Sequence, residues 1–325
     1  MKKFTISLIG ECMIEIQEIE PGVIQQTFGG DTLNTAIYMA RLSQGLPVQV
    51  DYVTALGTDQ FSDLMVAFWE KEQVGSSMVQ RIEGGRPGLY YIQLDEDGER
   101  VFHYWRGEAI ARQCFEQLDS KEILTRLGDY DAIYLSGISL AILLPESRNL
   151  LLDRLSELHS LRKEIYFDCN YRPHLWQSTQ EARTTYKRIL TLAHTVLLNV
   201  EEGIDLLEQK TIQGVHSVLG DHGVRESVIR DGGNPCSVFC DGSIEEVAAL
   251  PVVRVVDTTA AGDSFSAAYL LARRFGQDPC QAVLLAHQMA TYVISNKGAV
   301  APRETMPFTG EKLLKTTMNK EVNND

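Results

Sequence analysis

Residues 257–265 read Asp-Thr-Thr-Ala-Ala-Gly-Asp-Ser-Phe and lead directly into a predicted helix. The helix is predicted because apolar residues recur behind this stretch at helical spacing, at Phe265, Ala268, Tyr269, Ala272 and Phe275. The backbone N–H groups of Ala260, Ala261 and Gly262 are therefore expected at a helix N-terminus, where unpaired donors and the helix dipole favour an anion such as phosphate. Their small or absent side chains would let the anion approach the backbone.

Asp263 is the unusual member of this stretch, because a carboxylate in an anion site repels the anion. One interpretation is a plain helix cap beside a glycine turn. The other is a general base placed next to a phosphoryl group that the neighbouring N–H groups stabilise. The stretch alone leaves both interpretations open, so the remaining motifs have to decide between them.

The composition is that of an ordinary soluble globular protein with one large domain and an appendage. The chain has 325 residues, of which 44% are hydrophobic and 23% charged. Its net charge of −14 argues against nucleic acid or an anionic membrane as a partner, and no apolar run is long enough to span a bilayer. The six cysteines show no spacing typical of a metal site, and a strand is predicted directly after residue 3 with no signal peptide before it. We therefore expect reduced thiols and a cytoplasmic protein.

Strands alternate with helices along most of the chain, which predicts a mostly parallel sheet covered by helices on both faces. The strands are expected over residues 4–10, 49–56, 132–136, 164–168, 195–199, 227–230 and 238–240. Helices are expected to begin near residues 31, 59 and 263, and to cover residues 148–161, 179–192 and 203–209. For the helix after Asp59 the predicted inward face is Phe61, Leu64, Met65 and Phe68. In such sheets ligands bind at the carboxyl ends of the strands.

Two extended segments interrupt this alternation. Residues 11–28 mix apolar and acidic residues around Pro21-Gly22 and predict a solvent-facing hairpin. Residues 88–106 carry two aromatic runs joined by Asp97-Gly98, which is a strong hairpin signal. We predict that the segments 11–28 and 87–109 form one small β lid. The α/β core would then comprise residues 1–10, 29–86 and 110–310, followed by a polar tail over 311–325.

Two motifs at predicted strand ends suit a sugar acid. Residues 29–34, Gly-Gly-Asp-Thr-Leu-Asn, place Asp31 and Asn34 within one helical turn, and a carboxylate beside an amide suits sugar hydroxyls. A simple helix cap is the alternative. Residues 168–173, Asp-Cys-Asn-Tyr-Arg-Pro, place Arg172 where an arginine indicates an anionic substrate or phosphate, with a structural salt bridge as the alternative.

Three further groups point to a nucleotide and a closing lid. Residues 199–202, Asn-Val-Glu-Glu, could hold Mg²⁺ through water, although the same pattern also makes a helix cap. Residues 230–234, Arg-Asp-Gly-Gly-Asn, suit a tight turn against a nucleotide or a plain hairpin turn. In the lid, Tyr91 and Phe102 are expected to pack, whereas Arg106 could reach over a bound acidic sugar.

Three of these motifs, in this order, resemble the PfkB carbohydrate kinases of the ribokinase-like superfamily. Residues 29–34 resemble the first family signature, residues 199–202 the Asn-x-x-Glu motif, and residues 257–263 the second signature. The resemblance covers about residues 4–304. It implies a ribokinase-like three-layer α/β/α sandwich with a mostly parallel central sheet and a small β-sheet lid. It also implies ATP-dependent phosphorylation of a sugar with Mg²⁺, and leaves open a K⁺ ion beside residues 257–263.

Residues 88–91, 104–106, 135–139 and 170–173 resemble the family members that phosphorylate 2-dehydro-3-deoxy-D-gluconate on its 6-hydroxyl. The implied product is 2-dehydro-3-deoxy-6-phospho-D-gluconate. Another sugar kinase, such as a fructokinase, and a non-catalytic sugar-acid-binding protein remain as alternatives. A dinucleotide oxidoreductase is disfavoured, because no Gly-x-Gly-x-x-Gly follows the first strand.

The resemblance assigns roles to individual positions. Asp263 is similar to the family's catalytic base, and its anion hole would be formed by Ala260, Ala261 and Gly262. The sugar side would comprise Gly30, Asp31, Asn34, Tyr90, Tyr104, Arg106 and Arg172. The nucleotide side would comprise Asn170, Arg172, Asn199, Glu202, Arg230, Gly232, Gly233, Asn234, Ala260, Gly262 and His287, with Asn199 and Glu202 reaching Mg²⁺ through water.

Two positions depart from the family pattern. Ala260-Ala261 stands where many relatives have Gly-Ala, and Arg230-Asp231-Gly232 stands where relatives often carry Lys-x-Gly, so a contact of Arg230 with the nucleotide is less secure. The apolar, aromatic lid also predicts a homo-oligomer that forms through the lid.

Overall fold

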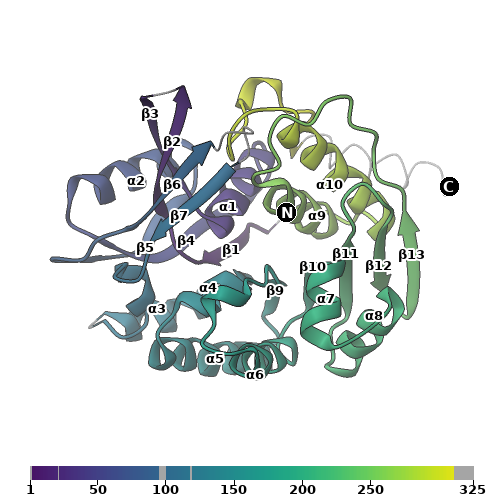
Figure 1. Ribbon diagram of the computed structural model, residues 1–325. Coiled ribbons are helices and arrows are strands. Elements are labelled where there is room, and N and C mark those ends of the chain that lie inside the picture. Colours follow the sequence, from purple (N-terminus) through teal and green to yellow (C-terminus); the bar gives the residue numbers. More distant parts are fainter. Residues whose placement is uncertain (1, 21, 95–99, 118, 311–325) are drawn as a thin grey trace.

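The central sheet of the computed structural model has nine strands in the order β13-β12-β11-β10-β9-β8-β1-β4-β5 (Figure 1). The structure describes residues 2–20, 22–94, 100–117 and 119–310, so the predicted Asp97-Gly98 turn and the tail over 311–325 lie outside the described residues. All neighbours from β5 to β11 pair in parallel, and β12 and β13 add two antiparallel strands at one edge. The strands are β1 (Phe4–Ile9), β4 (Val48–Gly57), β5 (Gly75–Ile82), β8 (Ala132–Ser136), β9 (Glu164–Asp168), β10 (Thr195–Asn199), β11 (Glu226–Arg230), β12 (Cys236–Cys240) and β13 (Ser243–Val247).

Helices cover both faces of this sheet. Successive side chains of each buried strand point to opposite faces, and each face forms its own hydrophobic core with the helices that pack on it. On β8, Tyr134 joins one core and Ile133 the other. The first core holds α1 (Asp31–Leu42), α2 (Gln60–Lys71), α9 (Ala261–Arg274) and α10 (Pro279–Ile294). The second core lies under α3 (Ser120–Arg126), α4 (Gly137–Ile142), α5 (Pro145–Ser160), α6 (Thr179–Leu190), α7 (Val200–Leu207) and α8 (Ile212–Asp221). The predicted three-layer α/β/α architecture is confirmed.

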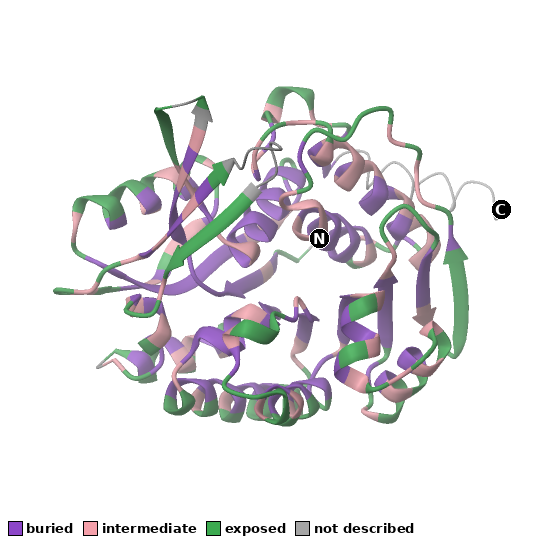
Figure 2. Ribbon diagram, viewed as in Figure 1, coloured by how far each residue is buried: buried purple, intermediate pink, exposed green. Residues whose placement is uncertain are grey.

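The two extended segments form a second sheet of four strands in the order β3-β2-β6-β7. Its strands are β2 (Met13–Glu20), β3 (Val23–Gly29), β6 (Gly88–Leu94) and β7 (Arg100–Trp105). Each hairpin is antiparallel, but the two hairpins are joined by parallel pairing of β2 with β6, where Met13 lies opposite Gly88. The outer strand β7 is exposed from Val101 to Trp105, in contrast to the buried helices beside the lid (Figure 2).

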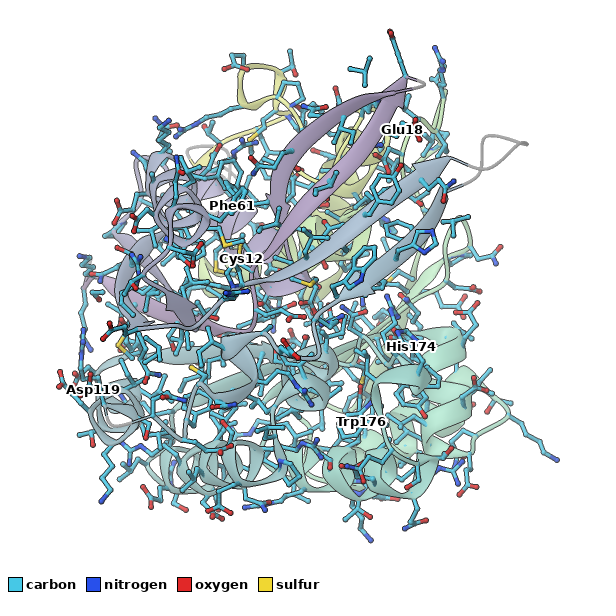
Figure 3. All side chains as sticks on the ribbon, turned by 60° about the vertical axis from the view of Figure 1, so that its left-hand side comes forward. Cys12, Glu18, Phe61, Asp119, His174 and Trp176 are labelled. Atoms are coloured by element: carbon cyan, nitrogen blue, oxygen red, sulfur yellow. The ribbon has the colours of Figure 1, made fainter. Side chains whose placement is uncertain are left out.

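Two local predictions were wrong. The segment 11–28 is not simply solvent-facing, because β2 is an inner strand of the lid sheet and buries Met13, Ile14 and Glu15. On α2 the inward residues are Ser62, Met65 and Trp69, whereas Phe61 (Figure 3) and Leu64 are exposed.

The N-terminal cap of α2 explains why a different face of the helix turns inward than the one predicted. The Asp59 carboxylate accepts hydrogen bonds from the N–H of Ser62 and from its hydroxyl, and that hydroxyl in turn accepts one from the N–H of Gly57. These bonds point Ser62 into the protein, and Met65 and Trp69 follow on the same helical face.

Candidate active site

A cleft of about 560 Å³ lies at the carboxyl edge of the central sheet, beneath the lid. Asp168, Asn199 and Arg230, which end the neighbouring strands β9, β10 and β11, all line it. The start of α9 forms another wall, and β6 and β7 contribute lid residues. The cleft therefore occupies the place where ligands bind in open α/β sheets.

Most of the residues predicted for the site line this one cleft. They are Gly30, Asp31, Asn34, Tyr90, Tyr104, Arg106, Asn170, Arg172, Asn199, Glu202, Arg230, Gly232, Ala260, Ala261, Gly262, Asp263 and His287. The structure also describes Gly233 and Asn234, but it places neither of them in the lining. Asn234 instead closes a turn, with its N–H donating to the carbonyl of Asp231 over 2.8 Å.

The start of α9 leaves backbone donors open toward the cleft. Ala260 precedes the helix in the left-handed conformation, with φ of 60° and ψ of 13°. The N–H of Ala261, one of the predicted anion donors, is directed at the carbonyl of Thr258 at 3.3 Å. Among the described residues, none accepts a backbone hydrogen bond from the N–H of Gly262 or Asp263. These two groups are consequently the open donors at this helix N-terminus.

The Asp263 carboxylate lies beside these donors. The amide nitrogen of Asn34, in the first turn of α1, donates to Asp263 Oδ2 over 2.9 Å. Burial raises the pKa of Asp263 well above its usual value, and the charges of Asp31 and Asp168 raise it further. The Asn34 hydrogen bond and the charge of Arg230 act in the opposite direction. A carboxylate with a raised pKa is a stronger proton acceptor, as a general base requires.

The sugar-side residues of α1 are held by their neighbours. The amide of Asn170 donates to Asp31 Oδ2 over 2.8 Å, and burial raises the pKa of Asp31. Gly30 lies so close to the preceding chain that an added Cβ would overlap the carbonyl oxygen of Glu11. A glycine is required there for α1 to approach the start of the lid.

Arg106 enters the cleft at the base of the lid and contacts the carboxylate of Glu11, which is only 2% exposed. Its guanidinium also lies 5.5 Å from the centre of the Tyr104 ring. Burial, followed by the charge of Arg112, lowers the pKa of Arg106 to about 10, so the side chain stays protonated at neutral pH. The negative charge of Glu11 thus already compensates the positive charge of Arg106, the arginine that was predicted to bind a sugar acid.

The lid aromatics differ from expectation in one respect. Tyr90 donates its hydroxyl to the Glu15 carboxylate, and its ring lies 5.7 Å from that of Tyr104. Phe102, which was predicted to pack, is 40% exposed and lines the cleft beside Tyr104.

Asn199 and Glu202 start α7 in a capping box. Glu202 accepts hydrogen bonds from the N–H of Asn199 over 2.9 Å and from the N–H of Tyr171 over 3.1 Å. Arg172 lies 3.5 Å from Glu202, with 46% of its side chain exposed. The helix-cap interpretation of this motif is therefore correct, and it does not exclude a second role because both residues line the cleft.

A magnesium ion fits this part of the cleft if phosphates and water supply most of its ligands. In the described part of the chain, no group of three or more His, Cys, Asp or Glu residues is arranged to hold a metal. Mg²⁺ needs only one or two protein oxygens when it is bound with phosphates. Asn199 and Glu202, which both line the cleft, would supply such oxygens next to the predicted phosphate site.

His287, on α10, forms an apolar wall. Its ring packs edge-on against Phe265 with 5.3 Å between ring centres, and burial lowers its pKa, so the imidazole is neutral at pH 7. A neutral aromatic surface of this kind suits a planar base.

Several lining residues were not predicted. They are Glu11, Met13, Phe102, Ile138, Asp168, Thr258, Thr259, Phe265 and Ala290. Glu11 and Asp168 could have been found, because both are acidic residues at the carboxyl end of a predicted strand. No helix among the described residues has the length and apolarity that a membrane crossing needs.

The family model for pfkB family carbohydrate kinases matches residues 3–306, so the chain belongs to this family. It is 44% identical over 305 residues to a 2-dehydro-3-deoxygluconokinase of Escherichia coli K12, covering 93% of this chain and 98% of that relative.

Solved structures show the same fold at low identity. A 2-dehydro-3-deoxygluconokinase of Thermotoga maritima superposes with a TM-score of 0.80 at 18% identity, over 96% of this chain and 98% of that one. A ribokinase-type protein of E. coli in complex with ATP and Mg²⁺ has a TM-score of 0.80 at 20% identity, over 98% of this chain and 100% of that one. The ribokinase-like fold predicted from the sequence is confirmed.

Proposed function

We propose that the protein transfers the γ-phosphoryl group of ATP to the 6-hydroxyl of 2-dehydro-3-deoxy-D-gluconate. The observation that carries this proposal is the position of the Asp263 carboxylate beside open backbone donors, in a cleft that also contains two arginines. The similarity to the E. coli relative supports the choice of sugar acid.

Asp263 is proposed as the general base that accepts the proton of the attacking hydroxyl. The backbone N–H groups of residues 260–262, joined by that of Asp263, would stabilise the charge that develops on the transferring group. For Ala261 this requires its N–H to turn from the carbonyl of Thr258 to the phosphoryl group. A well-placed donor of this kind contributes about 3–4 kcal/mol to transition-state stabilisation in comparable sites. Positioning and electrostatics then supply most of the catalysis, as is usual for phosphoryl transfer.

The sugar acid would lie between α1 and the lid. Asp31 and Asn34 accept and donate hydrogen bonds with its hydroxyls beside Gly30, and Arg106 and Arg172 bind its carboxylate. Tyr90 and Tyr104 cover it, so that closure of the lid excludes water that would otherwise accept the phosphoryl group.

ATP would lie along the ends of β9, β10 and β11, where Asn170, Arg172 and Asn199 surround the phosphates and residues 230–234 form the loop beside the nucleotide. His287 forms a wall of the adenine pocket. Bound Mg²⁺, held through water by Asn199 and Glu202, supplies charge neutralisation for the phosphates. We place this ATP-consuming activity in the cytoplasm.

A coupled assay of ADP release with the gluconate-derived acid, its galactonate epimer and fructose tests the proposal. We expect turnover with the acid and a far higher KM for fructose. Arg106→Lys and Arg172→Lys should raise KM for the acid much more than for fructose. Preference for fructose would support a fructokinase instead, and the lack of any sugar-dependent ADP release would support a binding protein.

We further propose that two copies associate through their lids. The edge strand β7 exposes Val101 (40%), Phe102 (40%), Tyr104 (46%) and Trp105 (61%), and an unpaired apolar edge of this kind normally requires a cover. Light scattering should give twice the chain mass for the wild type and a lower mass for Trp105→Asp. A monomeric wild type at all concentrations would contradict the proposal.

A further inference from the structure

Four residues form a buried polar cluster behind the start of α9. Arg230 Nη2 donates to Asp168 Oδ1 over 2.9 Å, and Arg230 Nη1 lies 3.3 Å from Asp168 Oδ2. The same Nη1 donates to the carbonyl of Gly262 over 3.0 Å and to Ser266 Oγ over 3.1 Å. Ser266 Oγ in turn donates to Asp168 Oδ2 over 2.7 Å. The ends of β9 and β11 are thereby fastened to the first turn of α9.

Gly262 is part of this arrangement because it has no side chain. A Cβ at this position would lie 3.0 Å from Arg230 Nη1, which is closer than ordinary packing allows. The missing side chain therefore makes room for the guanidinium, in addition to leaving the backbone open to an anion. Because the carbonyl of Gly262 and the N–H of Asp263 belong to one planar peptide unit, fixing the carbonyl also fixes the direction of that donor.

We propose that Asp168 and Arg230 are positioning residues that hold the first turn of α9, and that Arg230 is not a ligand of the nucleotide phosphates. The proposal rests on the proposed function, in which Asp263 and the adjacent N–H groups carry out the chemistry. It replaces the nucleotide contact that the sequence resemblance suggested for Arg230 with a role that acts through the backbone of Gly262.

The charges of the cluster support this role. Asp168 compensates the charge of Arg230, and three acceptors (Asp168 Oδ2, the Gly262 carbonyl and Ser266 Oγ) already surround its Nη1, so this nitrogen has no hydrogen left to donate to a phosphate. Burial lowers the pKa of Arg230, but Asp168 and Glu202 overcome this effect and raise it, which keeps the side chain charged. A cluster of this kind is expensive to disturb, because removing one member leaves another buried without a partner.

Kinetics of three variants, Asp168→Asn, Arg230→Met and Ser266→Ala, test the proposal in the full-length protein. A displaced first turn should lower kcat by about 10- to 100-fold, because small misplacements of reacting groups are costly. The Kd for ATP from calorimetry should change by less than about threefold, since no phosphate contact is lost. A tenfold or greater weakening of ATP binding with kcat preserved would overturn the proposal.

The matched control lies at the other ends of the same strand and helix. Arg273, in the last turn of α9, donates to the buried carboxylate of Glu226, the first residue of β11, over 2.6 Å. Glu226→Gln should lower the melting temperature as Asp168→Asn does, but leave kcat near the wild-type value. An equal loss of kcat in Glu226→Gln would show that any buried pair on α9 has this effect, and the proposal would be wrong.

The pH profile distinguishes positioning from general loss of structure. The charged and titratable groups that act on Asp263 are Asp31 and Tyr38 of α1, Tyr134 of β8, Asp168 of β9 and Arg230 of β11. Asp168→Asn removes a negative charge, so the acid limb of kcat should move to lower pH. Arg230→Met removes a positive charge, so the limb should move to higher pH. Shifts in the same direction, or none, would contradict the proposed placement of Asp168 and Arg230 close behind Asp263, where their charges act on its pKa.

Hydrogen exchange separates failure of this proposal from failure of the proposed function. Amide exchange over residues 260–264 should be faster in all three variants than in the wild type and in Glu226→Gln, whether or not the sugar acid is the substrate. Unchanged exchange in Ser266→Ala, the mildest variant, would overturn the positioning role even if Asp168→Asn failed to fold. Absence of turnover in the wild type would overturn only the proposed function.

Discussion

The side-chain amide of Asn34 donates a hydrogen bond to the carboxylate of Asp263 across 2.9 Å, and so joins the first turn of α1 to the first turn of α9. One residue belongs to the predicted sugar side of the cleft and the other is the proposed base. Their contact means that the predicted hydroxyl-binding group and the proposed base are fixed relative to each other before any substrate arrives.

Asp263→Asn should lower kcat by about 10²- to 10⁴-fold, the usual contribution of a general base. It should also stabilise the protein. Because the pKa of Asp263 is raised on folding, ionisation above the unfolded-state pKa favours the unfolded chain, and a neutral side chain removes that cost at neutral pH. Differential scanning calorimetry at pH 7 should show a higher melting temperature. Substantial residual kcat, with ATP and sugar binding intact, would rule out the base assignment.

Asn34→Ala should shift the pH dependence of kcat to higher pH. The Asn34 hydrogen bond lowers the pKa of Asp263, so its removal lets that pKa rise, and the base is ionised only at higher pH. Asn34→Asp should shift the acid limb further, because it adds a like charge. Measuring kcat as a function of pH for both variants and the wild type checks this order, in which the acid limb lies at the lowest pH in the wild type and at the highest pH in Asn34→Asp. An unmoved limb in both variants would show that the group titrating in kcat is not Asp263.

Glu11→Ala should destabilise the protein by about 3 kcal/mol, because it leaves the charge of Arg106 in a buried place without a partner. Denaturant unfolding measures this change. The double variant Glu11→Leu with Arg106→Met, which removes both charges, is the control and should recover much of the loss. Equal destabilisation in the single and double variants would mean that packing, and not the unpaired charge, decides the effect.

Ala260→Gly should stabilise the protein by less than about 1 kcal/mol. Ala260 has a φ of 60°, which costs a residue with a side chain about 1–2 kcal/mol, and the greater freedom of glycine in the unfolded chain offsets part of the gain. Ala261→Gly, one position later and inside α9, is the matched control and should be destabilising. Chemical denaturation of the two variants should give opposite signs, and a loss of stability in both would contradict the strain argument.

Much of the fold follows from short-range sequence patterns. The strands β8, β9 and β10 begin and end at the predicted residues, because each is a compact apolar run bounded by polar residues. The helix α10, which carries His287, was missed because it is apolar nearly all round, so no helical stripe marks it. The exposed β13 was missed because its sequence, Ser-Ile-Glu-Glu-Val, contains too few apolar residues to mark a strand.

From the residues themselves, the site was predictable where they follow a strand end or open a helix. The helix start led to Asp263 and its neighbours, and the strand-end rule led to Asn199 and Arg172 and could have led to Asp168. It could not show what Arg230 contacts, because Asp168 lies 62 positions earlier in the chain and no local pattern links the two. The prediction of the inward face of α2 failed for a similar reason. Hydrogen bonds of Ser62, and not hydrophobic periodicity, decide which face of this helix turns inward.

The parallel pairing of β2 with β6 has a consequence for the order of folding. Each lid hairpin is formed by neighbouring parts of the chain and can close by itself. The strand pair that joins the two hairpins instead brings Met13 to Gly88, and α1, β4, α2 and β5 lie between these two strands in the sequence. An isolated two-stranded hairpin is marginally stable in water, so neither half persists alone. We therefore expect the complete lid to assemble only after the chain has been synthesised as far as β7, and the long loop that it closes should make it a late event on the folding pathway.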